Sequence, residues 1–209
     1  MLRYLSILFC VTMSYGLMGQ PDSLTTDAES TETGLIIPSD AQTWEASEGL
    51  MRFRVDGKIG FSDESGRIVI KAAYDKASNF SEGLARVASD NLEGFIDRSG
   101  KMVIPLKYQR VWSFGDSLAM VVRESLYGFV DHRGIEVIPV QYDHANVPEE
   151  GRILVRDHGQ YGYLDLGGVI RIPLMYDQAE SFFQGRALVV LDGDRFYIDH
   201  TGRCIAGCE

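Results

Sequence analysis

Aspartate is the residue whose spacing in this chain first suggests chemistry. One aspartate opens a D-x-x-G motif at five places, each 34 residues after the last: Asp63, Asp97, Asp131, Asp165 and Asp199. Repeated carboxylates can bind calcium or exchange protons with a substrate. Each motif, however, offers a single carboxylate without a second oxygen ligand close by, and Asp and Gly at these two positions suit a tight turn. We therefore interpret the five aspartates as turn residues.

The histidines and serines show no pattern typical of a reactive centre. His132 and His200 share a repeat position of mixed composition that predicts a turn at the surface, and His144 is likewise expected to face solvent. None of the four histidines has the spacing of a metal site. The chain contains no G-x-S-x-G motif and no glycine-rich phosphate-binding loop. We expect no catalytic residues, no bound metal and no cofactor, and hence no enzymatic activity.

Two residue pairs remain as candidate sites. Cys204 and Cys208 form a C-x-x-x-C pair, which could close a small disulfide loop in an exported protein, two free thiols being the alternative. Trp44 and Trp112 occupy one position of the repeat, which holds Ser78, Asn146 and Glu180 in the other units. Such mixed composition predicts an outward-facing position, where tryptophan can stack on a sugar or anchor a protein partner. The alternative is that each tryptophan covers a neighbouring connector.

The elements that position these residues repeat every 34 residues, without insertion or deletion, from Glu48 to Cys204. Each unit contains three short runs rich in β-branched and aromatic residues, bounded by turn residues, and no helical periodicity. In the second unit the expected strands are "LARVA", "GFID" and "KMVIP", the last ending at its proline, and a connector, "LKYQRVWSFGDS", follows. The units are expected to begin near Glu48, Glu82, Asp116, Glu150 and Gln184.

This pattern predicts an all-β domain of five tandem three-stranded antiparallel meanders. Aromatic connector residues are expected to form the core between units: Tyr74, Phe80, Tyr176 and Phe182. Units of 34 residues are short for four-stranded propeller blades, which favours an open solenoid-like array. A closed five-bladed β-propeller is the alternative.

The repeat resembles the WG-repeat family of bacterial tandem β repeats over about residues 44–205. The segments that carry the resemblance include "EGFIDRSGKMVIPLKY", "YGFVDHRGIEVIPVQYDHA" and "EGLARV". The tryptophan that names the family is replaced in every unit, by Ile59, Glu93, Tyr127, Tyr161 and Arg195. The resemblance implies a binding or scaffold role without a shared chemistry.

The N-terminal segment differs in composition from the repeats. Arg3 precedes an uncharged, largely apolar run over residues 4–18, which predicts a signal peptide over residues 1–19, an uncleaved anchor being the alternative. Residues 20–43 are acidic and lack Lys and Arg, which predicts a flexible linker before a repeat domain at 44–209. We therefore expect an exported protein, periplasmic, at the cell envelope or extracellular, that meets the membrane only through its N-terminal segment.

Charge narrows the class of partner. The formal net charge is −10 and no Lys/Arg cluster is present, which argues against nucleic acid binding. The expected function is a non-catalytic protein-binding or scaffold module, and the alternative is binding of carbohydrate or peptidoglycan at the envelope.

Overall fold

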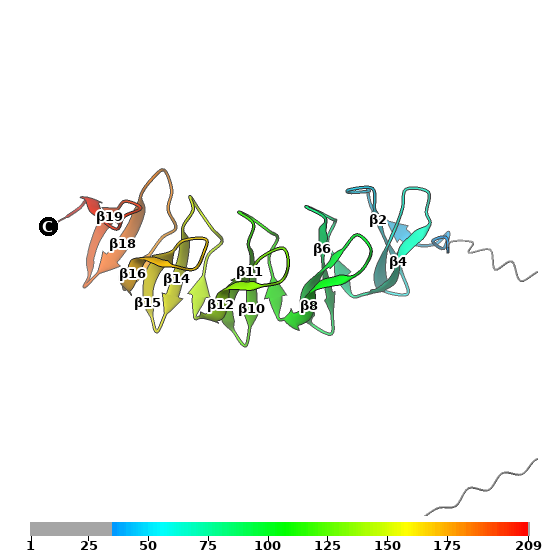
Figure 1. Cartoon of the computed structure of the whole chain (residues 1–209), viewed down its shortest axis with the longest axis horizontal. Helices are drawn as coiled ribbons and strands as arrows, with labels where there is room; N and C mark the ends of the chain where they lie inside the picture. The colour runs from blue at the N-terminus through cyan, green and yellow to red at the C-terminus, as the bar shows by residue number, and fades with distance from the viewer. Residues whose placement is uncertain (1–34, 209) are drawn as a thin grey trace, which may run out of the picture. The chain divides into compact units, whose positions relative to one another are not determined.

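A computed structural model describes residues 35–208, so the predicted signal peptide and residues 20–34 of the predicted linker lie outside the described part. The described residues form five four-stranded antiparallel sheets in tandem and contain no helix (Figure 1). Within this range no helix is available that could cross a membrane. The prediction of an all-β tandem array is confirmed.

Every sheet is built in the same way from one very short strand followed by a three-stranded meander. Sheet 1 contains β1 (Gln42–Thr43), β2 (Met51–Val55), β3 (Lys58–Ser62) and β4 (Ile68–Tyr74). Sheet 2 contains β5 (Lys76–Ala77), β6 (Leu84–Ser89), β7 (Leu92–Asp97) and β8 (Met102–Tyr108). Sheet 3 contains β9 (Arg110–Val111), β10 (Ala119–Arg123), β11 (Leu126–Val130) and β12 (Glu136–Tyr142).

The last two sheets follow the same order. Sheet 4 contains β13 (His144–Ala145), β14 (Ile153–Asp157), β15 (Gln160–Leu164) and β16 (Ile170–Tyr176). Sheet 5 contains β17 (Gln178–Ala179), β18 (Ala187–Leu191), β19 (Asp194–Ile198) and β20 (Cys204–Ala206). We call the loop between the two-residue strand and the meander of each sheet its connector loop.

The two-residue strands were not predicted, so each sheet has four strands where three were expected. In sheet 2, Lys76 and Ala77 pair with Ala88 and Val87 of β6, and the same pairing recurs in the other sheets. Part of each connector therefore forms a short strand that pairs with the first meander strand of the unit that follows. A run of two residues is too short to show the alternation that marks a strand in a sequence.

The third meander strand does not end at its proline, as was expected. Strand β8 continues through Pro105 to Tyr108, and its register with β7 shifts between the pairs Phe95–Ile104 and Glu93–Tyr108. Between these two pairs one residue of β7, Gly94, lies opposite three residues of β8, so β8 carries a bulge with two extra residues. Because β8 is an outer strand of its sheet, the missing N–H of proline at this bulge breaks no ladder hydrogen bond.

The core consists of four hydrophobic clusters, one between each pair of consecutive sheets. One face of a sheet carries large side chains and the opposite face carries small or β-branched ones. Between sheets 3 and 4, for example, Phe129 and Ile138 of sheet 3 pack on Ala145 and Val155 of sheet 4. The other three junctions repeat this arrangement. The middle sheets are therefore buried on both faces, which explains how short strands form a stable array.

The five sheets stand in chain order in one row, with sheet 1 and sheet 5 at its opposite ends (Figure 1). The array is open in this structure, as predicted. The connector aromatics lie between sheets: Phe80 packs on Phe61 with ring centroids 4.8 Å apart, and Phe182 packs on Tyr163 at 4.9 Å. Tyr176 is buried and Tyr74 is half-buried against the cluster between sheets 1 and 2.

Residues 35–43, which were predicted to belong to the linker, pack with sheet 1 instead. The Ile37 N–H donates to the Gly66 carbonyl at 2.9 Å, and the Ile68 N–H donates to the Leu35 carbonyl at 2.6 Å. Ile36 and Ile37 lie against Gly66 as Ile70 lies against Gly100 at the next turn. The segment thus takes the place of a preceding sheet, and we call residues 35–37 the N-terminal cap. The apolar run "LII" drives this packing.

The D-x-x-G motifs form the turns that were expected. The Asp97 Oδ1 accepts hydrogen bonds from the backbone N–H groups of Ser99 at 2.9 Å and Lys101 at 3.0 Å. Gly100 has φ +84°, in the left-handed region that favours glycine. The other four motifs repeat these carboxylate contacts. The five aspartates therefore hold turns together.

Candidate functional site

The two predicted tryptophans lie two sheets apart and do not form one site. Trp44 follows β1 of sheet 1, is half-buried, and lies beside two guanidinium groups, 4.9 Å from that of Arg52 and 5.7 Å from that of Arg54. Trp112 follows β9 of sheet 3, is half-buried, and packs against the cluster between sheets 3 and 4. Each tryptophan thus has one side in the array and the other toward solvent.

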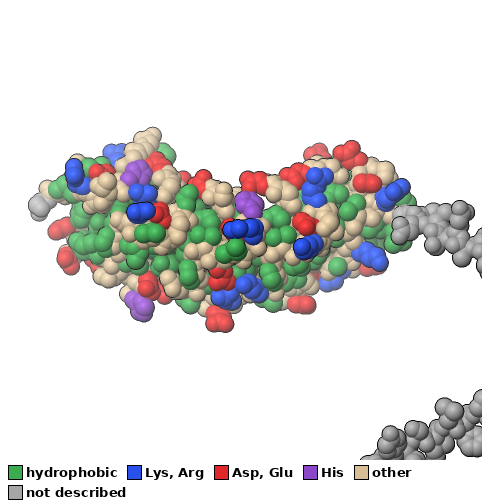
Figure 2. Space-filling view, in the orientation of Figure 1, with side chains coloured by type: hydrophobic (Ala, Val, Ile, Leu, Met, Phe, Trp, Pro, Cys, Tyr) green, Lys and Arg blue, Asp and Glu red, His purple; other side chains and the backbone are tan. Residues whose placement is uncertain are grey.

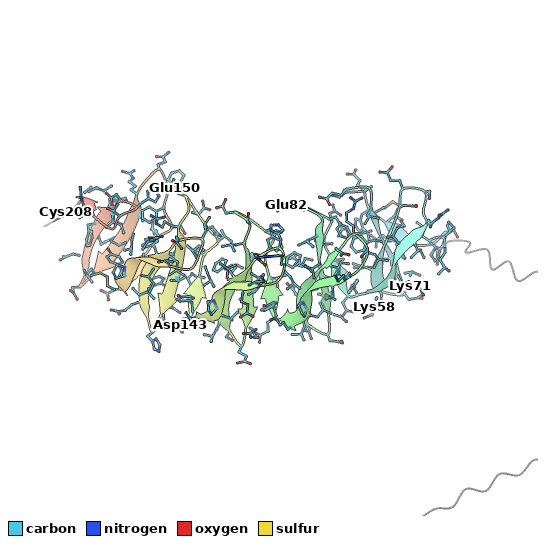
Figure 3. The ribbon with its side chains drawn as sticks, viewed as in Figure 1. Lys58, Lys71, Glu82, Asp143, Glu150 and Cys208 are labelled. Atoms are coloured by element: carbon cyan, nitrogen blue, oxygen red, sulfur yellow. A yellow bond between two sulfur atoms is a disulfide. The ribbon has the colours of Figure 1, made fainter. Side chains whose placement is uncertain are left out.

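Trp112 begins a row of four half-buried rings, Trp112, Tyr127, His144 and Tyr161, which we call the aromatic ladder. The centroids of neighbouring rings are 6.4 Å, 5.6 Å and 6.4 Å apart along the row. Two guanidinium groups flank it: that of Arg110 lies 5.3 Å from the Trp112 ring, and that of Arg156 lies 5.6 Å from the Tyr161 ring. Asp143, the neighbour of His144, marks the lower edge of the array near the ladder (Figure 3).

Three members of the ladder were missed in the sequence. Tyr127 and Tyr161 occupy the position where the family has tryptophan, and His144 was interpreted as a solvent-facing residue. One signal in the sequence could have revealed the two tyrosines. The family's tryptophan position is aromatic only in units three and four, and unit three also contains Trp112. Within sheet 4, Arg156 of β14 pairs with both His144 of β13 and Tyr161 of β15, which aligns these two rings. Within sheet 3, β10 pairs with both β9, which Trp112 follows, and β11, which carries Tyr127.

The opposite edge of the array carries a second repeated arrangement, centred on an acidic residue in four of the five connector loops, the fifth having Gln184 at this position. Glu48, Glu82, Asp116 and Glu150 are each the first residue of a two-residue turn and adopt φ values of 49° to 55°. Such values are costly for residues other than glycine, and surrounding contacts must hold them. Carboxylate contacts supply this support in two cases: Glu48 accepts a hydrogen bond from the Gly83 N–H at 3.1 Å, and Glu150 accepts one from the Gly185 N–H at 3.0 Å.

In sheets 3 and 5 this acid belongs to a stack of three groups. The His132 ring lies parallel to the Phe114 ring, 3.9 Å between centroids, and His132 Nε2 lies 2.8 Å from the Glu82 carboxylate of the preceding sheet. The His200 ring stacks in the same way on Phe182 at 4.3 Å, with its Nε2 3.1 Å from Glu150. We call this arrangement the ring–histidine–acid stack. These histidines were predicted to be solvent-facing turn residues, whereas the structure places them half-buried in contacts between sheets.

Sheet 4 lacks the stack. Pro148 stands where sheets 3 and 5 have Phe114 and Phe182, and Leu166 stands where they have histidine. The acid is retained as Asp116, but Leu166 has no polar group to offer it. Sheet 2 keeps the phenylalanine, since Phe80 is buried, and it has Arg98 at the histidine position. The Arg98 guanidinium lies near the acid of the preceding sheet: its Nη2 is 3.5 Å from where a methyl group on Gly49, the neighbour of Glu48, would lie.

A pocket opens where the stack is missing, between the connector loops of sheets 3 and 4. Its volume is about 360 Å³, and we call it the junction pocket. Its lining is mostly apolar and includes Phe114, Asp116, Leu118, Met120, Val147 and Pro148. The equivalent pocket one repeat earlier, where Phe114 takes the place of Pro148, measures about 190 Å³. Loss of one aromatic ring therefore accompanies a near doubling of the space.

The junction pocket lies on the hollowed edge of the array. The upper edge dips between its two ends in the space-filling view (Figure 2), and Glu82 and Glu150 stand on that edge on either side of the middle (Figure 3). The Val147 side chain at the pocket rim is 44% exposed. An apolar hollow with an exposed aliphatic residue and a carboxylate at its rim can bind an apolar group that carries a positive charge.

A polar cluster surrounds Glu136 at the junction of sheets 2 and 3. The Glu136 Oε1 accepts hydrogen bonds from the Tyr108 hydroxyl at 2.9 Å, the Arg123 Nη1 at 2.9 Å and the Lys107 Nζ at 3.2 Å. Burial raises the pKa of this carboxyl, but these donors outweigh burial and hold the pKa below its ordinary value. A carboxylate that is ionised and bonded to three donors ties sheets 2 and 3 together and is poorly suited to proton transfer.

Other residue types give no further centre among residues 35–208. No group of three His, Cys, Asp or Glu side chains with metal-binding geometry occurs in this range. The Cys204 and Cys208 sulfur atoms are joined in a disulfide that spans the end of β20. The disulfide closes a loop of five residues beside Phe196 and Asp194, which line a small pocket of about 150 Å³ with it.

The repeats and the fold together define a tandem β-repeat protein. The family model described as "WG containing repeat" matches residues 59–92, 94–126, 127–160 and 161–193, and the chain belongs to this family. The four matches span most of sheets 1 to 5 and confirm the predicted resemblance. None of the curated proteins compared with the chain matches it.

Several solved structures are weakly similar. A eukaryotic initiation factor matches with 13% identity and a TM-score of 0.44, over 78% of this chain and 54% of its own. Hsv2 of Kluyveromyces lactis matches with 9% identity and a TM-score of 0.40, over 78% of this chain and 61% of its own. The extracellular domain of the putative hybrid two component system BT4673 from B. thetaiotaomicron matches with 11% identity and a TM-score of 0.37, over 78% and 28%. With TM-scores below 0.5, these similarities do not bear on function.

Proposed function

We propose that this chain is a non-catalytic protein-binding module of an exported bacterial protein. The junction pocket is the observation that carries the proposal. It is a break in an otherwise regular series of contacts, and it leaves apolar side chains and a carboxylate open at the surface. Stacked sheets whose facing surfaces are buried form a rigid support, so variation in the connector loops changes the binding surface without changing the core.

Export rests on the N-terminal sequence, which predicts a signal peptide over residues 1–19. Fractionation of cells expressing the whole chain, with N-terminal sequencing of the product, tests it. A mature chain that begins near Gln20 and lies outside the cytoplasm supports export, and a cytoplasmic chain that retains Met1 contradicts it.

The binding proposal is tested by capture of proteins from envelope extract on the immobilised mature chain. A captured protein supports the proposal only if a substitution at the pocket abolishes its capture. The decisive comparison is therefore between the wild-type chain and the Val147→Arg variant. Val147 is exposed, so this change places a charge at the pocket rim without disturbing the core. A protein held equally by both chains, or no captured protein, counts against the pocket as the binding surface.

Carbohydrate or peptidoglycan binding is the second candidate, and the aromatic ladder is the observation that favours it. Aromatic faces stack on sugar rings, and flanking arginines donate hydrogen bonds to hydroxyl groups. A glycan array with wild type, Trp112→Ala and Trp44→Ala separates the candidates, because Trp44 lies off the ladder and serves as the matched control. Signal lost only in Trp112→Ala supports the ladder, and absence of signal in all three rejects carbohydrate binding.

A further inference from the structure

The ring–histidine–acid stack provides an internal template for what the junction pocket lacks. In sheets 3 and 5 an aromatic ring fills the space between connector loops, a histidine covers it, and the acid of the preceding sheet lies at the edge of the histidine. Three of the four connector loops that follow another sheet hold phenylalanine at this position: Phe80, Phe114 and Phe182. The fourth holds Pro148.

We propose that the junction pocket binds a peptide in which an aromatic side chain is adjacent to a basic residue. This inference rests on the proposed protein-binding function and specifies the partner's chemistry. The aromatic ring would enter the space above Pro148, which the equivalent phenylalanine fills in the other units. The basic group would lie beside Asp116, as His132 lies beside Glu82.

The walls of the pocket suit an aromatic ring. Leu118 and Met120 at its base are 5% and 6% exposed, and Phe114 forms one side. A volume of about 360 Å³ is near the lower end of the range of about 300–1,000 Å³ found for ligand pockets, so the pocket suits one bulky side chain better than a larger ligand. Methionine and aromatic walls also favour contact with an aromatic ring.

The charge of the site selects a basic neighbour over an acidic one. Asp116 is exposed at the rim, and Leu166 occupies the position from which histidine contacts the acid in sheets 3 and 5. The site therefore keeps the carboxylate of the stack and lacks the imidazole that contacts it in sheets 3 and 5. The net charge of −10 further favours approach of basic peptides.

Panning of a random peptide library displayed on phage against the mature chain tests the inference. Enrichment of peptides with Phe, Tyr or Trp next to Arg, Lys or His is expected. Synthetic versions of an enriched peptide, with the aromatic residue changed to Ala or the basic residue changed to Glu, are then titrated by fluorescence polarisation. Loss of the ring is expected to weaken binding by roughly tenfold or more, as for a buried anchor residue.

Variants of the protein separate the pocket from other surfaces. Pro148→Phe restores the residue of the other units, so it should fold and fill the pocket, and peptide affinity should fall at least as far as on loss of the peptide ring. Asp116→Asn should reduce the preference for a basic over an acidic neighbour by a few-fold, because an exposed ion pair is weak. Asp56→Asn makes the same change at an exposed hairpin turn of sheet 1. It should alter neither the peptide affinity nor the preference for a basic neighbour.

The outcomes are distinct for the inference and for the function beneath it. Peptide binding that survives Pro148→Phe, or enrichment of peptides without the aromatic–basic pair, overturns the inference. The proposed protein-binding function would still stand in either case. Failure to enrich any peptide counts against both. Should Pro148→Phe not fold, Val147→Arg at the exposed rim gives the same comparison. Phe183 is an exposed aromatic residue of this chain, at 70% exposure, and could enter the pocket of a second copy. Self-association that Phe183→Ala abolishes and Pro148→Phe blocks would identify the occupant as a second copy of the chain and overturn the inference.

Discussion

The glycine of the repeated "GF" and "GY" pairs is required by a close approach of two strands. In four units the bulge in the third meander strand carries that strand across this residue. A methyl group at Gly128 would lie 2.7 Å from the Ile138 carbonyl oxygen and 2.8 Å from the Val140 Cα. In sheet 5, β20 ends at Ala206, before such a bulge can form, and Phe196 is accommodated at the corresponding position. The departure from the repeat therefore has a local steric cause.

Gly128→Ala is predicted to lower the free energy of unfolding by about 1–3 kcal/mol, the usual cost of inserting a methyl group into a packed site. Urea denaturation of wild type and variant measures it. Gly115→Ala is the matched control, because Gly115 has an ordinary φ and no atom within 4 Å of the added methyl group. Equal, small losses in both variants would show that the close approach does not constrain this position.

The D-x-x-G aspartates predict a loss of stability in acid. At Asp97, hydrogen bonds from the Ser99 hydroxyl and from the Lys101 and Ser99 N–H groups outweigh burial and lower the pKa below its ordinary value of 3.8. The pKa of each other motif aspartate is lowered too. Since the folded state has the lower pKa, the stability from these carboxylates is complete above the unfolded value and is lost as pH falls through and below it.

Thermal unfolding between pH 7 and pH 3 tests this dependence. Asp97→Asn keeps an oxygen acceptor at the turn but does not titrate. The variant should therefore lose less melting temperature than wild type over the same range. An identical loss in the two proteins would show that this carboxylate does not contribute to acid sensitivity.

Residue roles were predictable from the sequence where one unit defines them. Asp97 and Gly100 act within one turn, and their roles followed from local turn chemistry. His132 acts through Phe114 of its own unit and Glu82 of the preceding one, 50 residues away. Leu166 at the equivalent position made this position resemble a solvent-exposed turn, whereas it marks the sheet in which Pro148 replaces the phenylalanine and no polar side chain faces the acid. Contacts between units cannot be read from alternation along a strand.

At the scale of the strand and sheet, the meanders were predictable and the packing between them was only partly so. Alternation of apolar residues identified the three longer strands of each unit. It did not identify the two-residue strands such as β9, whose formation depends on pairing with β10. The aromatic ladder depends on the same pairing, since His144 joins it from the two-residue strand β13. The sequence therefore predicted Trp112 as a candidate but not its neighbours.

The Glu136 cluster shows how one substitution strengthens a particular junction. Glu136 occupies the position held by Met102 in the preceding unit. Its three donors come from Tyr108 and Lys107 at the end of β8 and from Arg123 of β10. The carboxylate thus joins sheet 2 to sheet 3 at a position where units two and four have the exposed apolar residues Met102 and Ile170.

Glu136→Gln is predicted to lower the free energy of unfolding by roughly 1–2 kcal/mol, because charge-assisted hydrogen bonds become neutral ones. Chemical denaturation measures the change, and Glu64→Gln at an exposed turn removes the same charge as a control. If the two variants lose the same stability, the cluster contributes no more than a surface charge.

At the scale of the whole molecule, the described residues form an open row. A compact domain of about 175 residues has a radius of gyration near 16 Å. Small-angle scattering of the mature chain is predicted to give a larger value and an asymmetric distance distribution. A ring of five blades would instead give a compact, nearly symmetric distribution, and that result would favour the propeller alternative.

The N-terminal cap also determines how the row can end. Within the chain, each sheet offers its large side chains to the small face of the next, so two chains placed end to end could in principle continue the series. At sheet 1 the cap already covers the turn that a preceding sheet would contact. The cap therefore occupies the surface through which a second chain would have to extend the row in that direction.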